Sequence, residues 1–489
     1  MQRNYFMAGG IALAALAVVL GLVLLKERAD RPQAAADALA IQLQKEPALA
    51  GLYNAQARLL WIENNGALSR DGRRVQMLMA AAADHGLPAA RYRLPPAPAA
   101  DAGPKALARH DIAISTAVLR YARDMDQGVI RPAALFHDAE REPSEKILPQ
   151  QLGQAAGAGR AAAFLTELEP QGDYPKLKAA LKTYRTAPEW VPVEDRAALP
   201  ARLAAEGYLA EPKLAPRDVD AALKQWQIDN GLAPDGKLNK ETLAALNVSR
   251  RLRAEQIAAN MERWRWLPRR LPASYIWVNV PSAQLVLIEQ GRPVMVSRVV
   301  VGAPDSPTPV FVTTAEAVIV NPRWHIPKSI TENELLPRLQ NDPGYLEARD
   351  IFEEDGRLVQ KPGPQNALGR IKFDMPNGYD VYLHDTPSKN AFLSAERAVS
   401  HGCIRVQDVR ALAMKLTGLS ERELDEEIAS LETTRKPLAQ KLPVFIQYWT
   451  AMPQPSGRIG FREDVYGRDK RMIGGLERLA GTSGSTRKL

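Results

Sequence analysis

Cys403 is the only cysteine among the 489 residues of this sequence, and its neighbours favour nucleophilic chemistry. It lies in the stretch SHGCIR at residues 400–405. A catalytic thiol needs a nearby base to take its proton, and space for a carbonyl carbon to approach the sulfur. Gly402 supplies that space, because a residue without Cβ lets other groups come close and lets the backbone turn sharply.

Two histidines are candidate bases for this thiol. His401 lies two positions before Cys403, and in an extended segment this spacing puts both side chains on one face. His384 ends the strand-like run of residues 382–384 and could approach from a neighbouring strand. The backbone N–H groups of Gly402 and Cys403 could stabilise an oxyanion without any side chain. A lone cysteine is also often a small buried apolar residue, and the residues alone leave that alternative open.

The remaining composition indicates neither a metal site nor a nucleic-acid partner. The six histidines and one cysteine show no ligand spacing, so we expect no metal and no cofactor. Lys and Arg total 64 and Asp and Glu 56, which gives a net charge of +8. These charges are spread along the chain without a nucleic-acid-binding motif. They indicate a solvated surface that is compatible with an anionic polymer or a membrane nearby.

Residues 5–25 carry no charge and are long enough to span about 30 Å of hydrocarbon as a helix. The charged run of residues 26–31 precedes the small residues 34–36, which favours an uncleaved anchor over a signal peptide. We therefore expect residues 1–4 to be a cytoplasmic tail of a single-pass inner-membrane protein. The positive charges after residue 25 favour the opposite orientation. We nevertheless place the catalytic portion in the periplasm, because the proposed substrate lies there.

The soluble part begins with a helical region at residues 32–195. It is rich in alanine, and its apolar residues recur at helix-like intervals. Residues 197–249 form a small helical hairpin of a different kind. Val219, Leu223 and Trp226 share one helix face, and Asn239 is placed to cap a second helix. Residues 250–273 are interpreted as a linker.

Residues 274–474 have the alternating apolar pattern of strands, with predicted strands at 311–320, 380–383 and 443–449. Helical segments are predicted at 332–339 and 409–416. Residues 330–370 are too long for an ordinary connection within a β domain and are predicted to form a functional capping segment. Residues 475–489 are expected to be a flexible tail. The fold class is therefore multidomain α+β, with a helical N-terminal domain, a small helical domain and a mainly-β catalytic domain.

Two of these regions resemble known families. Residues 222–227, 230–232, 234–236 and 242–247 resemble the peptidoglycan-binding domain type 1. His384, the spacer 385–399 and the sequence SHGC at 400–403 are similar to the catalytic motif of L,D-transpeptidases of the YkuD type.

The likeness extends to the large, membrane-anchored YcbB-like subgroup. It runs through residues 259–266, 278–281, 321–324, 363–369, 382–387 and 448–451. His325 departs from the subgroup, in which a shorter residue is frequent, and this concerns only the detail of the donor groove.

The resemblance implies a peptidoglycan cross-linking reaction. Cys403 would attack the carbonyl of the third residue of a tetrapeptide stem and release the terminal D-alanine, leaving a thioester. His384 would act as the base, oriented by the backbone carbonyl of Asp385. An amine of a neighbouring stem would then attack the thioester and form a 3→3 cross-link. Carbapenem-type inhibitors would acylate Cys403.

Further roles follow from the same resemblance. His401 and Gly402 would shape the oxyanion site together with Cys403. Ser400 and Arg405 would hold the loop, although a substrate contact is an alternative for Arg405. The residues that would line the pocket, with ordinary core packing as the alternative, are Tyr382 and Trp324.

Two other functions remain open at this point. The thioester could pass to water, which would make the protein an L,D-carboxypeptidase. The chain could also be a wall-binding scaffold in which the thiol is incidental.

Overall fold

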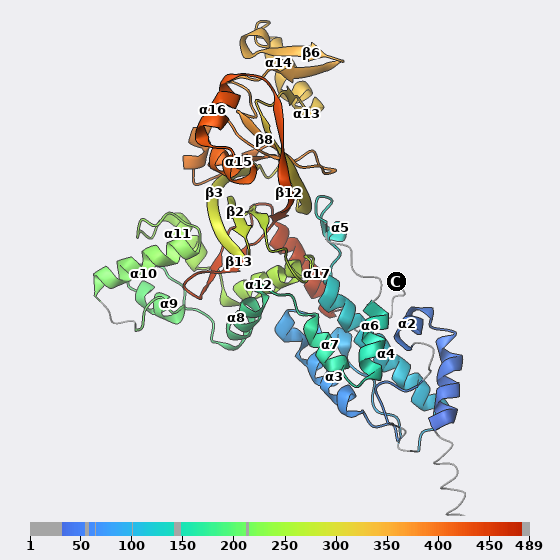
Figure 1. The fold of residues 1–489 in the computed structure, drawn as a ribbon. Helices are drawn as coiled ribbons and strands as arrows, with labels where there is room; N and C mark the ends of the chain where they lie inside the picture. The colour runs from blue at the N-terminus through green and yellow to red at the C-terminus, as the bar shows by residue number, and fades with distance from the viewer. Residues whose placement is uncertain are drawn as a thin grey trace, which may run out of the picture. The chain divides into compact units, whose positions relative to one another are not determined.

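The computed structural model describes residues 32–53, 58–63, 65–99, 101–140, 148–211 and 215–481. The predicted cytoplasmic tail at 1–4 and the predicted membrane-spanning segment at 5–25 lie outside these residues. Within the described ranges, no helix combines the length and the apolar character that crossing a bilayer requires. The chain forms two compact units, labelled by element in Figure 1. Among the described residues, the first comprises those up to Val129, those from 148 to Gln171 and those from Leu476 onward, and the second comprises those from Ile130 to 140 and from Gly172 to Gly475.

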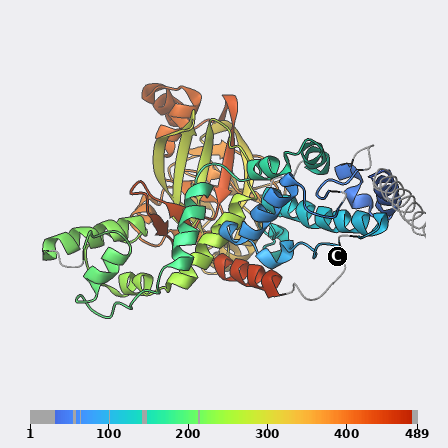
Figure 2. The same cartoon turned by 90° about the horizontal axis from the view of Figure 1, so that it is seen from below.

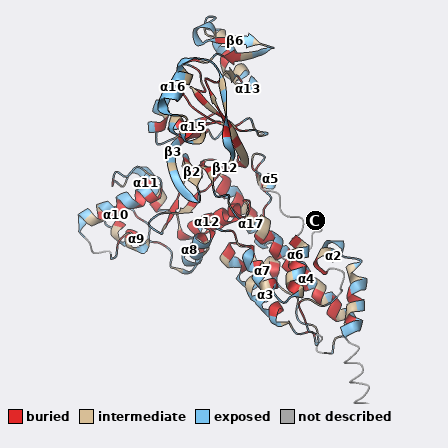
Figure 3. Cartoon of the chain, in the orientation of Figure 1, coloured by how far each residue is buried: buried red, intermediate tan, exposed pale blue. Residues whose placement is uncertain are grey.

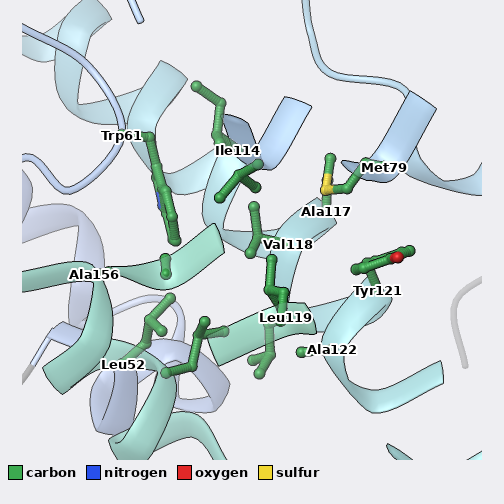
Figure 4. Packing of buried hydrophobic residues seen from close by; sticks show 14 of the residues in the cluster. Leu52, Trp61, Met79, Ile114, Ala117, Val118, Leu119, Tyr121, Ala122 and Ala156 are labelled. Atoms are coloured by element: carbon green, nitrogen blue, oxygen red, sulfur yellow. The ribbon is translucent and has the colours of Figure 1, made fainter. Parts of the chain in front are cut away.

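The first unit is helical, as the alanine-rich sequence predicts. Its core lies around Trp61, Val118 and Leu119, which are buried together with residues of the neighbouring helices (Figure 4). Two of these helices touch closely, because a Cβ at Gly153 would lie 1.9 Å from the carbonyl oxygen of Leu52. A helix at 32–43 is followed by 3₁₀ turns at Pro47–Leu49, Ala81–His85 and Ala89–Tyr92 and by α2 (Ala50–Tyr53), α3 (Arg70–Ala80), α4 (Pro104–Gln127), α6 (Leu148–Gly157) and α7 (Ala161–Glu167).

A closed sheet forms the centre of the second unit. The strand order is β10-β3-β11-β9-β8-β4-β12-β1-β2, and β2 also pairs with β3, so the sheet closes into a ring. Figure 2 shows these strands side by side. Alternate residues such as Ile276, Val278, Leu285 and Leu287 are fully buried, which is the period expected for strands around a core. The strands are β1 (Tyr275–Asn279), β2 (Gln284–Glu289), β3 (Arg292–Gly302), β4 (Phe311–Val320), β8 (Ile371–Asp374), β9 (Leu383–His384), β10 (Ala398–Ser400), β11 (Ile404–Val406) and β12 (Thr434–Gln447).

The predicted helical hairpin has its own buried cluster, which includes Val219, Leu223 and Trp226. Asn239 caps the second helix of the hairpin, because its side chain accepts a hydrogen bond from the Thr242 N–H at 2.8 Å. The helices are α9 (Leu199–Ala205), α10 (Pro216–Asp229) and α11 (Lys240–Leu246).

The predicted linker at 250–273 is wrong over most of its length. Residues Arg250–Trp264 form α12, which is buried along most of its length (Figure 3). Ile257 and Met261 pack against α8 (Tyr174–Thr186) and against residues of β12 in one core cluster. The charged residues of α12 hide this from a simple hydropathy pattern, because they are paired inside the protein. Glu262 and Arg265 form a fully buried ion pair at 2.8 Å.

The predicted capping segment at 330–370 is folded rather than a loose loop. Three short strands pair in the order β5-β7-β6, and Ile326, Leu335 and Ile351 form a small core beside them. The π-helical turn Thr331–Leu335 leads into α14, in the range predicted as helical. The elements are α13 (Lys328–Ile330), α14 (Leu336–Leu339), β5 (Trp324–His325), β6 (Ile351–Glu354), β7 (Arg357–Gln360) and a 3₁₀ turn at Glu347–Arg349.

Two smaller predictions differ from the structure. The strand expected at 380–383 is reduced to β9, because Asp380 adopts a left-handed backbone with φ of 54°. The tail expected at 475–489 is wrong for its first part, because α17 continues to Gly481, and residues 482–489 lie outside the described part. The remaining elements are α5 (Pro132–Leu135), α15 (Val409–Thr417), α16 (Glu421–Ala429), α17 (Arg468–Gly481), β13 (Ala451–Pro453), β14 (Ile459–Phe461) and a 3₁₀ turn at Lys389–Leu393.

Candidate active site

Two neighbouring strands bring Cys403 and His384 to the same part of the sheet. β9 ends at His384, and β11 begins one residue after Cys403. The two strands are parallel, with Ile404 opposite Leu383 and Arg405 opposite His384. The Ile404 N–H donates to the Tyr382 carbonyl oxygen at 3.0 Å. Residues far apart in the sequence are therefore held in one fixed register.

The turn before Cys403 is held by Ser400. Its Oγ donates to the Cys403 carbonyl oxygen at 2.6 Å and accepts a hydrogen bond from the Gly402 N–H at 3.2 Å. Gly402 has φ of +107°, a conformation that other residues rarely adopt. An added Cβ would meet no atom closer than 3.8 Å. The positive φ confirms the sharp turn predicted at this glycine, and its contribution of space for a substrate stays a prediction.

A second set of hydrogen bonds supports the same turn from the β3–β4 connection. The Thr308 Oγ1 donates to the Gly402 carbonyl oxygen at 2.8 Å and accepts from the Gly302 N–H at 2.8 Å. The Tyr466 hydroxyl donates to the Gly302 carbonyl oxygen at 2.5 Å. Thr308 and Tyr466 were not predicted from the sequence, because they contribute through folding and no local motif contains them.

The thiol is partly buried and has several polar groups close to it. Its Sγ donates to the Asp380 carbonyl oxygen at 3.6 Å. Burial raises the pKa of the Cys403 thiol above its usual value, while hydrogen bonds from Tyr382 and the charges of Lys372 and Arg405 act in the opposite direction. Since burial dominates, the sulfur is protonated at neutral pH.

His384 is buried and uncharged. Burial, followed by the positive charge of Arg405, lowers the pKa of His384 to about 3. The Asp385 backbone opposes this shift. Among the described residues, however, the buried Nδ1 has no hydrogen bond of normal geometry. A neutral imidazole beside a neutral thiol can accept its proton, whereas an imidazolium could not.

Asp385 anchors the segment that leads into β8. Its Oδ2 accepts a hydrogen bond from the Arg370 N–H at 2.8 Å, and its other carboxylate oxygen pairs with Lys389. Gly369, at φ of +62°, packs directly on it, since an added Cβ would lie 2.4 Å from the Asp385 carboxylate. The Asp385 side chain therefore fixes the backbone that follows His384.

Tyr382 connects the thiol to two further side chains. Its pKa is raised by burial, then by the charge of Cys403 and a hydrogen bond to the sulfur, while a hydrogen bond from Trp324 lowers it. The ammonium group of Lys372 lies 3.8 Å from the centre of the Tyr382 ring. Tyr382 therefore adjoins the thiol and Trp324 adjoins Tyr382, and their role in lining a pocket stays a prediction. Lys372 was not predicted.

His401 and Cys403 do not lie on one face of a strand. Residues 401–403 form a bend, and β11 begins only at Ile404, so the extended geometry assumed for His401 and Cys403 is wrong. The His401 side chain is 54% exposed, and its Nε2 lies 2.7 Å from Oε1 of Glu334 in the capping segment. His401 therefore connects the catalytic turn to that segment.

In the part of the chain that the structure describes, no three or more His, Cys, Asp or Glu side chains form a cluster that could hold a metal ion.

Three family models match separate parts of the chain. Residues 273–436 match the L,D-transpeptidase catalytic domain, residues 47–181 match the model named "Scaffold domain", and residues 193–246 match the model named "Putative peptidoglycan binding domain". The α+β multidomain fold class is confirmed by these matches and by the structure. The YcbB-like subgroup and the membrane anchor stay predictions.

Individual proteins give the same kind of likeness. A Haemophilus influenzae protein named "Putative L,D-transpeptidase" is 32% identical over 241 residues, which is 45% of this chain and 49% of the relative. The match thus spans about half the length of that relative. Among solved structures, an L,D-transpeptidase from Stackebrandtia nassauensis has 14% identity and a TM-score of 0.23, covering 52% of this chain and 92% of its own. L,D-transpeptidase 1 of Mycobacterium tuberculosis has 14% identity and a TM-score of 0.18, covering 36% and 61%.

Proposed function

We propose that this protein is a peptidoglycan L,D-transpeptidase that forms 3→3 cross-links through a thioester on Cys403. The observation that supports the proposal is the pairing of β9 with β11, which brings Cys403, in the turn before β11, and the neutral, buried His384 to the same part of the sheet. This pair lies in the segment that matches the L,D-transpeptidase catalytic domain. A buried cysteine with a packing role alone would need neither the histidine nor the polar turn.

In the first step, the Sγ of Cys403 attacks the carbonyl carbon of the third residue of a donor tetrapeptide. The thiol proton passes to His384 as the sulfur–carbon bond forms. The carbon–nitrogen bond to the terminal D-alanine then breaks, and His384 returns the proton to the leaving nitrogen. The products are a thioester and free D-alanine, and the imidazole is neutral again.

The oxyanion of this step needs N–H donors. Among the described residues, the backbone N–H of Cys403 makes no hydrogen bond, whereas that of Gly402 already donates to Ser400. We assign the oxyanion contact to the Cys403 N–H and a supporting role to Gly402. Ser400 then acts by keeping the turn in the geometry that aims this N–H group.

In the second step, the amine on the third residue of a neighbouring stem attacks the thioester. The carbon–sulfur bond breaks, an amide bond forms, and the proton lost by the amine restores the thiol. If water attacks instead, the product is a tripeptide, which is the carboxypeptidase outcome. The folded segment at 330–370 is proposed to cap the groove, and its contact with His401 supports this role.

The location is part of the same proposal. Residues 5–25 would hold the chain in the inner membrane with the catalytic portion in the periplasm, where peptidoglycan stems are found. The segment at 193–246 that matches a peptidoglycan-binding model would contact the wall polymer. Carbapenem-type acylating agents are expected to react with Cys403.

Incubation of the purified full-length chain with tetrapeptide muropeptides tests this function. Mass analysis should find cross-linked dimers and free D-alanine, and the Cys403→Ala variant should make neither while it still binds peptidoglycan. Tripeptide without dimers would identify a carboxypeptidase. Unchanged muropeptides, with a Cys403 that remains open to alkylation, would contradict both enzymatic functions and favour the scaffold.

A further inference from the structure

Lys372 is a half-buried lysine without an acidic partner in the candidate active site. It lies on β8, and burial lowers its pKa. Among the described residues its ammonium group forms no ion pair, although Asp374 and Asp380 are near enough to act on its pKa. Two other lysines differ, because the exposed Lys389 pairs with Asp385 and the partly buried Lys436 pairs with Glu427. Withdrawing a cation from water without a partner is unfavourable, so an unpaired one suggests a ligand.

The register of the sheet aims Lys372 at the reaction centre. Lys372 lies opposite His384 in the β8–β9 pair, and Arg405 lies opposite His384 in the β9–β11 pair. Residues directly opposite one another on adjacent strands point to the same face of a sheet. Cys403 precedes Arg405 by two positions and adjoins this row. The base and the two cations therefore share one face of the sheet, and the thiol lies in the turn just before β11.

Tyr382 fixes the position of the Lys372 ammonium group. The Nζ atom lies 3.8 Å from the ring centre, within the range of a cation–π contact. The same phenol and the Cys403 sulfur lie near enough for each to shift the pKa of the other. The Tyr382 ring thus adjoins both the cation and the nucleophile, and the cation is held near the atom that forms the new bond.

We propose that Lys372 binds the C-terminal carboxylate of the donor stem peptide and so selects stems that end directly after the scissile bond. This specificity role rests on the proposed transpeptidase function. In such a stem only the amide nitrogen and one Cα separate the attacked carbonyl from the terminal carboxylate. A cation beside the thiol therefore lies where that carboxylate arrives. A stem extended by one residue presents a neutral amide at the same place.

The test compares two donors that differ only in this charge. One is the tetrapeptide muropeptide with its free terminal carboxylate, and the other is its C-terminal carboxamide. The full-length wild type should use the acid roughly 10- to 100-fold better in kcat/KM, the factor expected for a hydrogen bond to a charged group. Most of the difference should lie in KM, because the carboxylate contact exists both before and during the attack.

Variants at Lys372 test whether this residue causes the preference for the acid donor. Lys372→Met should use both donors equally, because its kcat/KM should fall for the acid donor alone. Lys372→Arg should keep part of the preference for the acid. Lys441→Met removes an exposed lysine of β12 that pairs with Glu316 of β4, and it should behave as wild type. Thermal unfolding of each variant checks that the second unit is folded.

The outcomes separate this proposal from the proposed function. If Lys372→Met keeps the full preference for the acid, the carboxylate role is wrong even though the enzyme works. The proposal is also overturned if the variant slows both donors equally, which would mean that Lys372 acts on the thiol. If Arg405→Met rather than Lys372→Met abolishes the preference, the carboxylate binds the other cation. Absence of product from either donor with wild type would instead contradict the transpeptidase function itself.

Discussion

At the scale of single residues, the candidate site combines a thiol and a histidine that are both uncharged. Many catalytic cysteines are described as thiolates made stable by nearby charge. Here burial dominates for both groups, although Lys372 and Arg405 lie close to the sulfur. The proton transfer to His384 must therefore accompany the attack rather than precede it.

The ionisation of Cys403 gives a direct prediction. Alkylation of the full-length wild type by iodoacetamide should be slow at neutral pH and rise only above the usual range of a thiol, because burial raises the pKa. Tyr382→Phe should shift this rise to still higher pH, since the lost hydrogen bond stabilises the thiolate. Mass spectrometry of the chain labelled at a series of pH values measures the alkylation of wild type and of Tyr382→Phe. Tyr92→Phe, in the first unit, is the control. An alkylation midpoint below the usual pKa range of a thiol in wild type would contradict the raised pKa of Cys403.

The low pKa of His384 predicts a dependence of stability on pH. The unfolded histidine takes up a proton near pH 6.5, whereas the folded one does so only near 3. Protons therefore favour the unfolded chain as the pH falls below 6.5, and the stability contribution present above that pH is lost. The expected loss is about 1.4 kcal/mol per pH unit in this window.

His384→Gln should remove this part of the acid sensitivity. Urea unfolding of the second unit at pH 7 and pH 5, followed by tryptophan fluorescence, gives the comparison. If wild type and His384→Gln lose equal stability between these values, the histidine is not buried in its neutral form.

Sequence reasoning at this scale found residues that belong to a motif or adjoin it. Cys403, His384 and Tyr382 are of this kind, and the strand register brings them together. It did not find Lys372, because a lysine in an ordinary strand has no distinguishing pattern. Only the pairing of β8 with β9 places it beside the site.

At the scale of elements, short turns hold the catalytic groups in place. The strands β9 and β11 contain only two and three residues, so their pairing alone fixes little. Hydrogen bonds from Ser400 and Thr308 add the missing constraint on the turn before Cys403. The catalytic geometry therefore depends on residues that never contact the substrate.

Removal of the Ser400 hydroxyl tests this dependence. Ser400→Ala should lower the turnover rate about 10- to 100-fold and lower stability by about 1–2 kcal/mol, because two hydrogen bonds to the turn are lost. Rates of D-alanine release and urea unfolding measure the two effects. Ser430→Ala, in an exposed turn, is the matched control. Unchanged turnover in Ser400→Ala would show that the turn is held by other contacts.

Gly369 gives a second test of an element. Its left-handed backbone and its contact with Asp385 both oppose a side chain. Gly369→Ala should cost about 2–4 kcal/mol, the sum of backbone strain and a steric clash. Gly356→Ala shares the positive φ but meets no atom within 4 Å, so it should cost only about 1 kcal/mol. If the two variants have equal unfolding free energies, the contact between Gly369 and Asp385 does not oppose a side chain as assigned.

The capping segment was predicted from its length alone, and its role stays a prediction. Sequence length could not reveal its three paired strands, because β5, β6 and β7 are too short to give a clear alternation. The contact between His401 and Glu334 likewise depends on the folded segment.

At the scale of the whole molecule, the helical hairpin is easier to recognise in the sequence than the connections around it. The hairpin has its own buried cluster, so its sequence pattern is self-contained. The residues after it were interpreted as a linker, because α12 contains many charged residues. In the structure those charges are buried in pairs, such as Glu262 with Arg265 and Arg263 with Asp469. The Arg263 partner is distant in sequence, so a local pattern cannot show that this charge is buried, whereas Glu262 and Arg265 lie three residues apart on the same helix.

The hairpin docks on the catalytic part of the second unit through Asn230. Its side chain accepts a hydrogen bond from the Phe461 N–H at 3.1 Å and donates to the Trp226 carbonyl oxygen at 2.8 Å. Asn230→Ala should therefore increase the hydrogen exchange rate of the Phe461 amide, while Asn341→Ala, at an exposed site, should not. Exchange mass spectrometry over this region measures the change. An unaltered rate in Asn230→Ala would mean that the hairpin is held elsewhere.

The acyl-enzyme is the central claim, and intact-protein mass measures it most directly. Full-length wild type is mixed with the tetrapeptide muropeptide alone and quenched in acid within seconds. The account predicts a mass increase equal to the donor minus D-alanine, located on Cys403 and absent from Cys403→Ala. Release of D-alanine with no adduct on wild type, or an adduct that persists in Cys403→Ala, would contradict it.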